Sequence, residues 1–319
     1  MNAVILGYGV VGKGIEILTN SLEDINIKYV YVRKEKENLP YFSNNEDMVV
    51  QDDIDIVFEC LNGLEPANTL IQKALKKGKH VISSNKAVVA TYLDTYLELE
   101  KEYGGSIQVE ACVAGGIPFI DALLKLKRLE PLQGYEGIFN GTSNYILDSM
   151  QKNNLDFEDV LKQAQEKGYA EKDPSNDIDG VDVYYKTKIS NSLAFNTPIV
   201  DIPYYAGIRT IKMLDIKFIK MNNKVLRHLS ISRQIGDKII SIIAPCCMDK
   251  NDFLANVPSN YNAQKILSHS FDTLGYYGQG AGQLPTAQAM VQNALDTLED
   301  KERKIVYAKP KEFDTSLLK

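Results

Sequence analysis

The segment from Glu171 to Lys186 groups side chains that could bind a charged substrate and move a proton. Five carboxylates fall within the twelve residues that end at Asp182, and Lys186 follows four residues later. If a turn at Gly180 opens a helix, Asp182 and Lys186 share one helical face as an i, i+4 pair. Glu171 and Asp177 then lie in the preceding loop. The segment predicts a site that holds a cationic substrate group and places an amine for proton transfer.

Two other interpretations of this segment compete with a catalytic site. In a calcium-binding EF-hand loop with Gly180 at the sixth position, the bidentate glutamate of position 12 would be Lys186. The charge of a lysine would repel the metal, which disfavours calcium. The segment could also be a solvated acidic loop before a helix. The rest of the chain decides between that loop and a site.

A glycine motif near the N-terminus indicates a nucleotide cradle. Residues 3–7 are an apolar, strand-like run, and helical spacing follows from Gly12 to Leu18. In this context Gly7 permits a tight turn, Gly9 lets the backbone approach a pyrophosphate, and Gly12 allows close helix–strand packing. The cofactor-binding residues that this motif predicts are Gly7, Gly9, Val10, Val11 and Gly12.

The end of the second strand pattern bears on the choice of cofactor. A free ribose diol would favour an acidic residue there, but the strand ends with Val32, Arg33 and Lys34. Cationic side chains suit a 2′-phosphate, so we expect NADP in preference to NAD. Glu35 nearby keeps NAD possible. The cradle and the acidic segment together suggest a redox enzyme that acts on a small amino acid.

Bulk properties exclude several other classes of protein. The 319 residues are enough for two domains, and the net charge of −6 disfavours binding to nucleic acid. No run approaches the ~18 apolar residues of a membrane span, and the chain enters a strand at once without a signal segment. The four cysteines form no CxxC pair and the three histidines no HxxxH, so we expect no catalytic metal. A cytoplasmic protein is expected.

The element pattern predicts an α/β fold with two parts. The strand-like segments of the N-terminal half are 3–7, 25–32, 55–59, 79–83 and 107–113, and the helical ones are 12–18, 65–77 and 91–102. Their alternation predicts a Rossmann-like, doubly wound parallel sheet. This dinucleotide-binding domain spans 1–126 and is completed by the C-terminal segment 284–319, with a helix at 286–298.

The second part, 127–283, is expected to be an α+β domain for substrate binding, catalysis and dimerisation. Its predicted helices are 118–127 (at the boundary), 145–152 after a cap at 140–144, 157–167 and 182–195. A strand is expected from Gly134 to Phe139. Residues 225–273 read as antiparallel strands with one helix, 262–269.

Five motifs, in this order along the chain, resemble those of homoserine dehydrogenases. They are Ser84-Asn-Lys86-Ala, Glu110-Ala-Cys-Val-Ala-Gly-Gly-Ile-Pro118, Asn140-Gly-Thr-Ser-Asn-Tyr-Ile-Leu147, the segment from Gly168 to Lys186, and Gly280-Ala-Gly282 with Thr286-Ala287. The resemblance implies reversible oxidation of L-homoserine to L-aspartate 4-semialdehyde with NADP or NAD, a step in threonine, methionine and isoleucine biosynthesis.

The resemblance also implies a role for each site residue. Lys186 is the acid/base, Asp182 binds or orients the substrate, and Lys86 lies between nicotinamide and substrate. Glu171 binds the substrate α-ammonium, and Asp177 is a further active-site carboxylate. Asn62, in the loop after the third strand, and Gly282 are expected to contact the cofactor.

Further implications concern an ion, assembly and regulation. A monovalent cation, usually sodium, would bind backbone carbonyls of Glu110, Val113, Gly115 and Ile117. A homodimer would form through the sheet of the second domain. Because the chain stops at Lys319, a C-terminal ACT domain and feedback through it are not expected.

The protonation state of the catalytic lysine stays open at this point. Burial beside a second cation, which could be Lys86, would lower the pKa of Lys186, whereas Asp182 would raise it. A charged ammonium could still stabilise an alkoxide. Two alternatives to homoserine dehydrogenase also stay open: an oxidoreductase of another amino acid or semialdehyde, and a catalytically silent NADP(H)-binding sensor.

Overall fold

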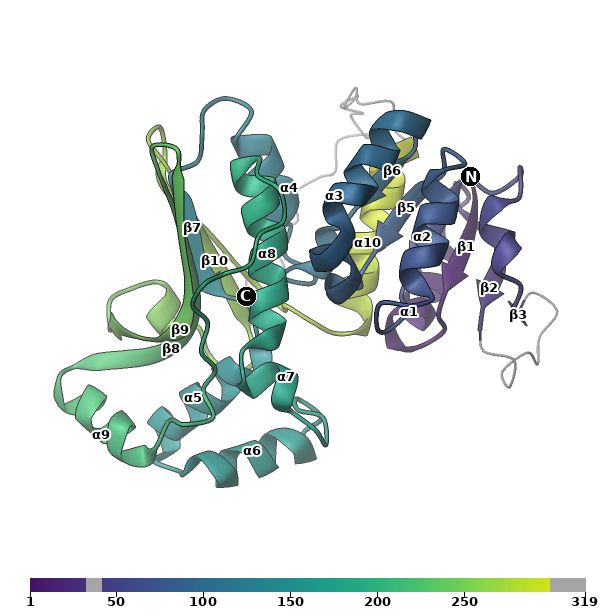
Figure 1. Ribbon diagram of the computed structural model, residues 1–319. Coiled ribbons are helices and arrows are strands. Elements are labelled where there is room, and N and C mark those ends of the chain that lie inside the picture. Colours follow the sequence, from purple (N-terminus) through teal and green to yellow (C-terminus); the bar gives the residue numbers. More distant parts are fainter. Residues whose placement is uncertain (33–41, 299–319) are drawn as a thin grey trace, which may run out of the picture.

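The computed structural model describes residues 1–32 and 42–298 as two sheets, each with its own helices, lying side by side (Figure 1). Arg33 and Lys34, the predicted contacts of a 2′-phosphate, lie outside the described residues. No helix in the described ranges is long and apolar enough to cross a membrane.

The first sheet has six parallel strands in the order β3-β2-β1-β4-β5-β6. The strands are β1 (Asn2–Leu6), β2 (Asn26–Tyr31), β3 (Phe42–Ser43), β4 (Ile56–Glu59), β5 (His80–Ser83) and β6 (Ser106–Gln108). This is the strand order of dinucleotide-binding folds, with the ligand crevice where the order reverses, between β1 and β4. The predicted Rossmann-like fold is confirmed.

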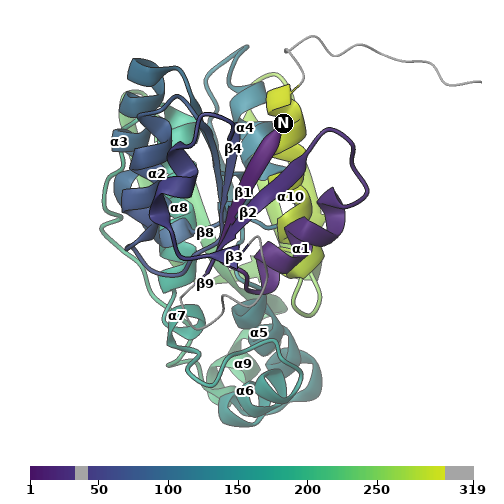
Figure 2. The same ribbon diagram turned by 90° about the vertical axis from the view of Figure 1, so that its right-hand side faces the viewer.

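Helices cover both faces of this sheet (Figure 2). On one face lie α1 (Val10–Thr19) and α10 (Gln283–Leu298); on the other lie α2 (Ala67–Leu75), α3 (Lys86–Tyr103) and the short 3₁₀ helix η2 (Glu46–Val50). Alternate residues of β1 point to opposite faces of the sheet and pack against the helices there. Ala3 and Ile5 pack toward α1 and α10, whereas Val4 and Leu6 pack toward α2 and α3. A strand buried on both faces is typical of a parallel sheet.

The last described helix returns to the first sheet and packs against α1. A Cβ atom at Gly14 would lie 2.8 Å from the Cβ of Ala287, so the two helices touch where only glycine fits. Ala287, Met290 and Ala294 are buried in the same cluster as Ile15. The end of the described chain is therefore part of the dinucleotide-binding layer.

The second sheet is antiparallel, in the order β11-β10-β7-β8-β9. Its strands are β7 (Gly134–Ile138), β8 (Lys224–Ile235), β9 (Lys238–Asp249), β10 (Asn262–Ser268) and β11 (Asp272–Gly278). The helices of this half are α4 (Phe119–Leu126), α5 (Gly141–Asn153), α6 (Phe157–Glu166), α7 (Ser175–Ile178), α8 (Val181–Phe195) and α9 (Met213–Met221), with the 3₁₀ helices η3 (Glu110–Cys112) and η4 (Leu254–Asn256).

Helix α8 lies between the antiparallel sheet and α3 (Figure 1). On its sheet side, Tyr135 and Phe139 pack edge-to-face on Phe119 of α4. One buried cluster contains these rings, Val183 of α8 and Val88 of α3. Because one core holds both helices, their positions relative to each other are fixed, and this determines where their first turns meet.

Three features of the second half differ from the prediction. Residues 262–268 form the inner strand β10 instead of a helix. Their alanine, glutamine, lysine and leucine favour helices, but pairing with β7 and β11 outweighs that propensity. Helix α9 was not predicted, and α5 begins directly after Asn140 instead of at 145.

Two differences affect the site. The strand predicted for 107–113 ends at Gln108, and η3 follows. The Glu110 carboxylate accepts from the backbone N–H groups of Ile120 and Asp121, which ties η3 to the start of α4. Helix α3 begins at Lys86, well before the predicted residue 91. Lys86 therefore lies on the first turn of a helix, which fixes its backbone more firmly than a loop would.

Candidate active site

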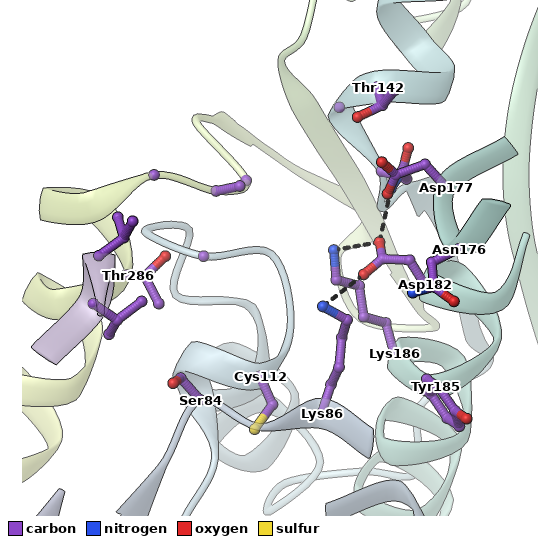
Figure 3. A pocket seen from close by; sticks show the side chains of 18 of the residues that line it. Ser84, Lys86, Cys112, Thr142, Asn176, Asp177, Asp182, Tyr185, Lys186 and Thr286 are labelled. Atoms are coloured by element: carbon purple, nitrogen blue, oxygen red, sulfur yellow. Dashed lines mark hydrogen bonds and ion pairs between the residues drawn. The ribbon is translucent and has the colours of Figure 1, made fainter. Parts of the chain in front are cut away.

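A cavity of about 920 Å³ lies between the two halves of the molecule (Figure 3). Its lining comes from the first turn of α1, from the loops after β4 and β5, from the loop around Gly115, and from the first turns of α3, α5 and α8. This is the carboxyl edge of the parallel sheet, where α/β folds bind ligands. The predicted site residues Val10, Val11, Asn62 and Gly282 all line the cavity.

The glycine motif forms a cradle at the N-terminus of α1. Gly7 has a φ of +95°, and a Cβ there would lie 2.9 Å from the carbonyl oxygen of Cys60. A Cβ on Gly12 would lie 2.1 Å from the Gly7 carbonyl oxygen, so the helix packs tightly on the turn. At Gly9, the N-cap, a Cβ would meet nothing within 4 Å. This open space beside free helix N–H donors fits a pyrophosphate.

Lys86 is the first residue of α3 and reaches into the cavity toward the other half. The side chain of Asn85 caps the helix by accepting from the backbone N–H of Val88. The Lys86 Nζ lies 2.9 Å from Oδ1 of Asp182. The negative charge of Asp182 outweighs burial and raises the pKa of Lys86. Lys86 is therefore an ammonium at neutral pH.

Asp182 and Lys186 form the predicted i, i+4 pair on the first turns of α8. Gly180, with a φ of +85°, is the residue that opens the helix. The Lys186 Nζ lies 2.8 Å from Oδ2 of Asp182 and donates to the carbonyl oxygen of Phe139 at 2.6 Å. Burial alone would raise the pKa of Asp182, but the charges of Lys186 and Lys86 hold it well below its usual range. The carboxylate stays ionised between two amines.

Asn140 joins the two carboxylates of the site. Its Nδ2 donates to Oδ1 of Asp177 at 2.7 Å and to Oδ2 of Asp182 at 2.9 Å, while its Oδ1 caps α5 by accepting from the backbone N–H of Ser143. Burial, together with the charge of Asp182, raises the pKa of Asp177. The sequence predicted only the capping role of Asn140. A capping motif shows that the side-chain oxygen accepts a backbone N–H, but it does not show which groups the side-chain nitrogen binds.

The rim of the cavity carries further polar groups. Glu171 is exposed there, and Gln165 anchors its backbone by donating to the Glu171 carbonyl oxygen at 3.0 Å. Thr142, which lines the cavity, donates to the carbonyl oxygen of Tyr169 at 2.6 Å. The sequence gives no separate role to Thr142, Tyr169 or Tyr185, although all three line the cavity and lie inside the recognised motifs.

The turn from Glu110 to Ile117 contains the four residues predicted to bind a monovalent cation. Burial and the charge of Asp121 raise the pKa of Glu110. Its carboxylate oxygens accept backbone N–H groups at the start of α4. Gly115 has a φ of +57° and packs against the Gly280 backbone. No cluster of His, Cys, Asp or Glu in the described ranges could hold a metal. An ion at this turn would have to use backbone carbonyls.

Comparison with protein families gives matches to both halves. The family model described as homoserine dehydrogenase matches residues 118–295, and that of its NAD-binding domain matches residues 7–110. The homoserine dehydrogenase of Neisseria gonorrhoeae is 34% identical over 312 residues, which cover 93% of this chain and 72% of the relative. That of a Synechocystis strain is 36% identical over 312 residues, with coverages of 92% and 72%.

Solved structures show the same likeness. A homoserine dehydrogenase from Thiobacillus denitrificans is 33% identical and superimposes with a TM-score of 0.89, covering 95% of this chain and 75% of its own. A hyperthermophilic archaeal homoserine dehydrogenase in complex with NADPH has a TM-score of 0.81 over 95% of this chain and 99% of its own. At 24% identity, that second likeness shows the shared fold.

Proposed function

This chain belongs to the homoserine dehydrogenase family and is an NAD(P)-dependent oxidoreductase acting on the CH–OH group of homoserine; from that premise, we propose that Lys186 is its acid/base. The observation that carries the proposal is the position of Asp182, whose two carboxylate oxygens each pair with one lysine in the cavity. A second hypothesis, a silent cofactor sensor, would not need this paired arrangement.

The nicotinamide cofactor, when bound, supplies the hydride acceptor or donor of the reaction. In the reduction, the Lys186 ammonium gives a proton to the carbonyl oxygen as the carbonyl becomes an alcohol. In the oxidation, Lys186 must first release that proton to solvent, and its amine then takes the hydroxyl proton as the C–O bond becomes a carbonyl. Lys86, held as an ammonium by Asp182, lies where its charge can stabilise negative charge that develops on the same oxygen. Asp182 orients both amines and carries the compensating charge.

The acidic rim supports a role in binding the amino group of the substrate. Glu171 and Asp177 both line the cavity, and Asn140 fixes the Asp177 carboxylate. A substrate α-ammonium placed there would pair with carboxylate, and its hydroxyl end would point toward the two lysines. This orientation assigns Glu171 and Asp177 to affinity for homoserine rather than to chemistry.

The test compares substrates and variants in one assay of nicotinamide absorbance. We expect turnover with homoserine and none with aspartate as the hydroxyl-lacking control. Glu171→Gln should raise the KM for homoserine about tenfold or more, with the KM for the cofactor unchanged. Turnover of a different hydroxy amino acid in place of homoserine would support the other-oxidoreductase alternative. Cofactor binding without any turnover would support the sensor.

For the cofactor, NADP in preference to NAD is part of the proposal. The Gly7 backbone N–H donates to the carbonyl oxygen of Tyr31 at 3.0 Å, so the end of β2 lies beside the cradle. The next residues in sequence include Arg33 and Lys34, which could pair with a 2′-phosphate. Replacing both with alanine should weaken NADPH binding and leave NADH binding unchanged.

The proposed homodimer would use the outer face of the antiparallel sheet. Helices α4 and α8 cover the inner face (Figure 1), whereas Ile240 on the outer face is 55% exposed beside half-buried Ile231 and Ile242. Sedimentation should give a dimer for the wild type and a monomer for Ile240→Glu. A monomeric wild type would contradict this part of the proposal.

Two finer assignments complete the proposal. A sodium ion would bind carbonyls of Glu110, Val113, Gly115 and Ile117, whose turn includes the left-handed residue Ala114; an activity that is equal in sodium and in a bulky organic cation would contradict it. A cytoplasmic location is consistent with the free thiols of Cys60, Cys112, Cys246 and Cys247. Fractionation of cells would test it.

A further inference from the structure

Glu59 is a buried carboxylate that the proposed chemistry does not use. It is the last residue of β4 and is 0% exposed. Its position is beside the cofactor crevice, because the residues that follow it, Cys60 to Gly63, line the cavity. A carboxylate in such a place is costly to bury unless its oxygens are hydrogen-bonded. The hydrogen bonds of Glu59 therefore indicate its role.

The two oxygens of Glu59 bind two different parts of the cavity wall. Oε1 accepts from the backbone N–H of Leu61 at 2.8 Å, which fixes the loop after β4. Oε2 accepts from the hydroxyl of Ser83 at 2.6 Å, at the end of the neighbouring strand β5. One side chain thus joins the ends of two adjacent strands at the carboxyl edge of the sheet.

The connection continues from Ser83 to the first turn of α3. The Ser83 Oγ accepts from the backbone N–H of Asn85 at 3.0 Å, so its own hydroxyl proton must go to Glu59. The Asn85 amide lies 3.5 Å from Oε1 of Glu59 and donates to the Gly63 carbonyl oxygen at 2.8 Å. Asn85 is also the cap of the helix that begins with Lys86.

We propose that Glu59 is a positioning residue for the cofactor side of the site: its carboxylate holds the 61–63 loop and the first turn of α3 in one arrangement. Lys86 then faces Asp182 while Asn62 faces the cofactor crevice. The inference rests on the proposed roles of Lys86 and Asn62. Glu59 touches neither reactant and acts only through these neighbours.

The ionised form of Glu59 is the one that fits its bonds. Both Leu61 and Ser83 donate to it, so a proton on either oxygen would oppose one of these donors. Burial nevertheless raises the pKa of Glu59 to about 7. Cys60, Cys112 and Tyr96 face it, and burial raises the pKa of each well away from neutrality. Lys86 stays an ammonium at the pH values at which Glu59 titrates.

The test is the affinity of the full chain for NADPH, measured by nicotinamide fluorescence from pH 6 to 8.5 with Glu59→Gln. The variant keeps the shape of the side chain but replaces one acceptor with a donor. We expect about tenfold weaker binding at pH 8 and a lower kcat, with the KM for homoserine nearly unchanged. The ratio of wild-type to variant affinity for NADPH should rise with pH through about 7 as Glu59 ionises. Taking the ratio removes the effect of titration of the cofactor's own phosphate.

Two further variants test whether the effect comes from the hydrogen bonds of Glu59. Ser83→Ala retains the carboxylate but removes its donor, and it should weaken NADPH binding in the same direction. Glu100→Gln is the matched control, because Glu100 also accepts a backbone N–H, that of Ile107 at 2.8 Å, away from the cavity. Its NADPH affinity should equal that of the wild type.

Equal NADPH affinity and equal pH dependence in wild type and Glu59→Gln would overturn the inference. So would a loss of affinity in Glu100→Gln as large as in Glu59→Gln, because that would indicate general destabilisation. Failure of the proposed chemistry is distinguishable, since it would appear as absent turnover with homoserine while the NADPH titrations still report on Glu59.

Discussion

The charged atoms of Lys86 and Asp182 lie 2.9 Å apart, although the two residues belong to the first turns of different helices in different halves of the molecule. Helices α3 and α8 share a buried cluster, so this ion pair is built on a rigid contact. The pair links the dinucleotide-binding sheet to the helix that carries Lys186. We infer that the link aligns cofactor and acid/base during the reaction.

Asp182→Asn should abolish most of the activity. The variant removes the charge that orients both lysines and leaves two amines unpaired near each other, so we expect kcat to fall about 100-fold or more. Asp201→Asn is the control, because Asp201 pairs with Lys188 of the same helix at 2.9 Å but is exposed. A kcat for Asp182→Asn within threefold of the wild type would contradict the role of the carboxylate.

Asn140 can be tested for its two roles separately. Asn140→Ser keeps a side-chain oxygen that can cap α5 but removes the amide that joins Asp177 to Asp182. We expect stability close to the wild type and activity lower by about tenfold. Asn140→Ala should also lose about 1 kcal/mol of stability through the cap. Urea unfolding and steady-state kinetics measure the two effects, and equal activity in the serine variant and the wild type would refute the bridging role.

His228 should make the fold less stable in acid. Its Nε2 donates to the carbonyl oxygen of Ala206, and burial lowers its pKa to about 4. Because the unfolded state binds the proton near pH 6.5, stability is lost as the pH falls from about 6.5 toward 4. The loss should be about 3 kcal/mol from this residue. His228→Asn should flatten the pH dependence of urea unfolding, and the exposed His269→Asn should not.

Gly14 tests the contact between the first and last described helices. A methyl group there would lie 2.8 Å from the Ala287 Cβ, so Gly14→Ala should cost about 1–3 kcal/mol of stability. Adding Ala287→Gly should restore part of it by making room. If the single variant is as stable as the wild type, α10 does not depend on this close approach.

How far the sequence predicts the structure depends on the range of the interaction. Gly7, Gly9 and Gly12 act locally, so their spacing beside a strand was sufficient to predict the cradle. The i, i+4 pair of Asp182 and Lys186 was predictable for the same reason. The predicted helix 91–102 lacks the first turn of α3, which the side chain of Asn85 caps by accepting from the backbone N–H of Val88.

Long-range contacts were not predictable from residue patterns. The bonds from Asn140 to Asp177 and Asp182 depend on how α5 and α8 pack. The strand β10 depends on its neighbours β7 and β11, since its composition favours a helix. The pKa of Lys86 depends on a carboxylate from the other half of the molecule.

The central claim is that Lys186 transfers the substrate proton, and homoserine-dependent reduction of NADP and NAD by wild type and Lys186→Ala tests it most directly. We predict strong turnover by the wild type and a loss of about 100-fold or more in the variant, with NADPH affinity intact. Lys188→Ala, two residues along the same helix, is the control and should keep its activity. Wild-type activity retained in Lys186→Ala would contradict the account, as would no turnover of homoserine by a wild type that binds NADPH tightly.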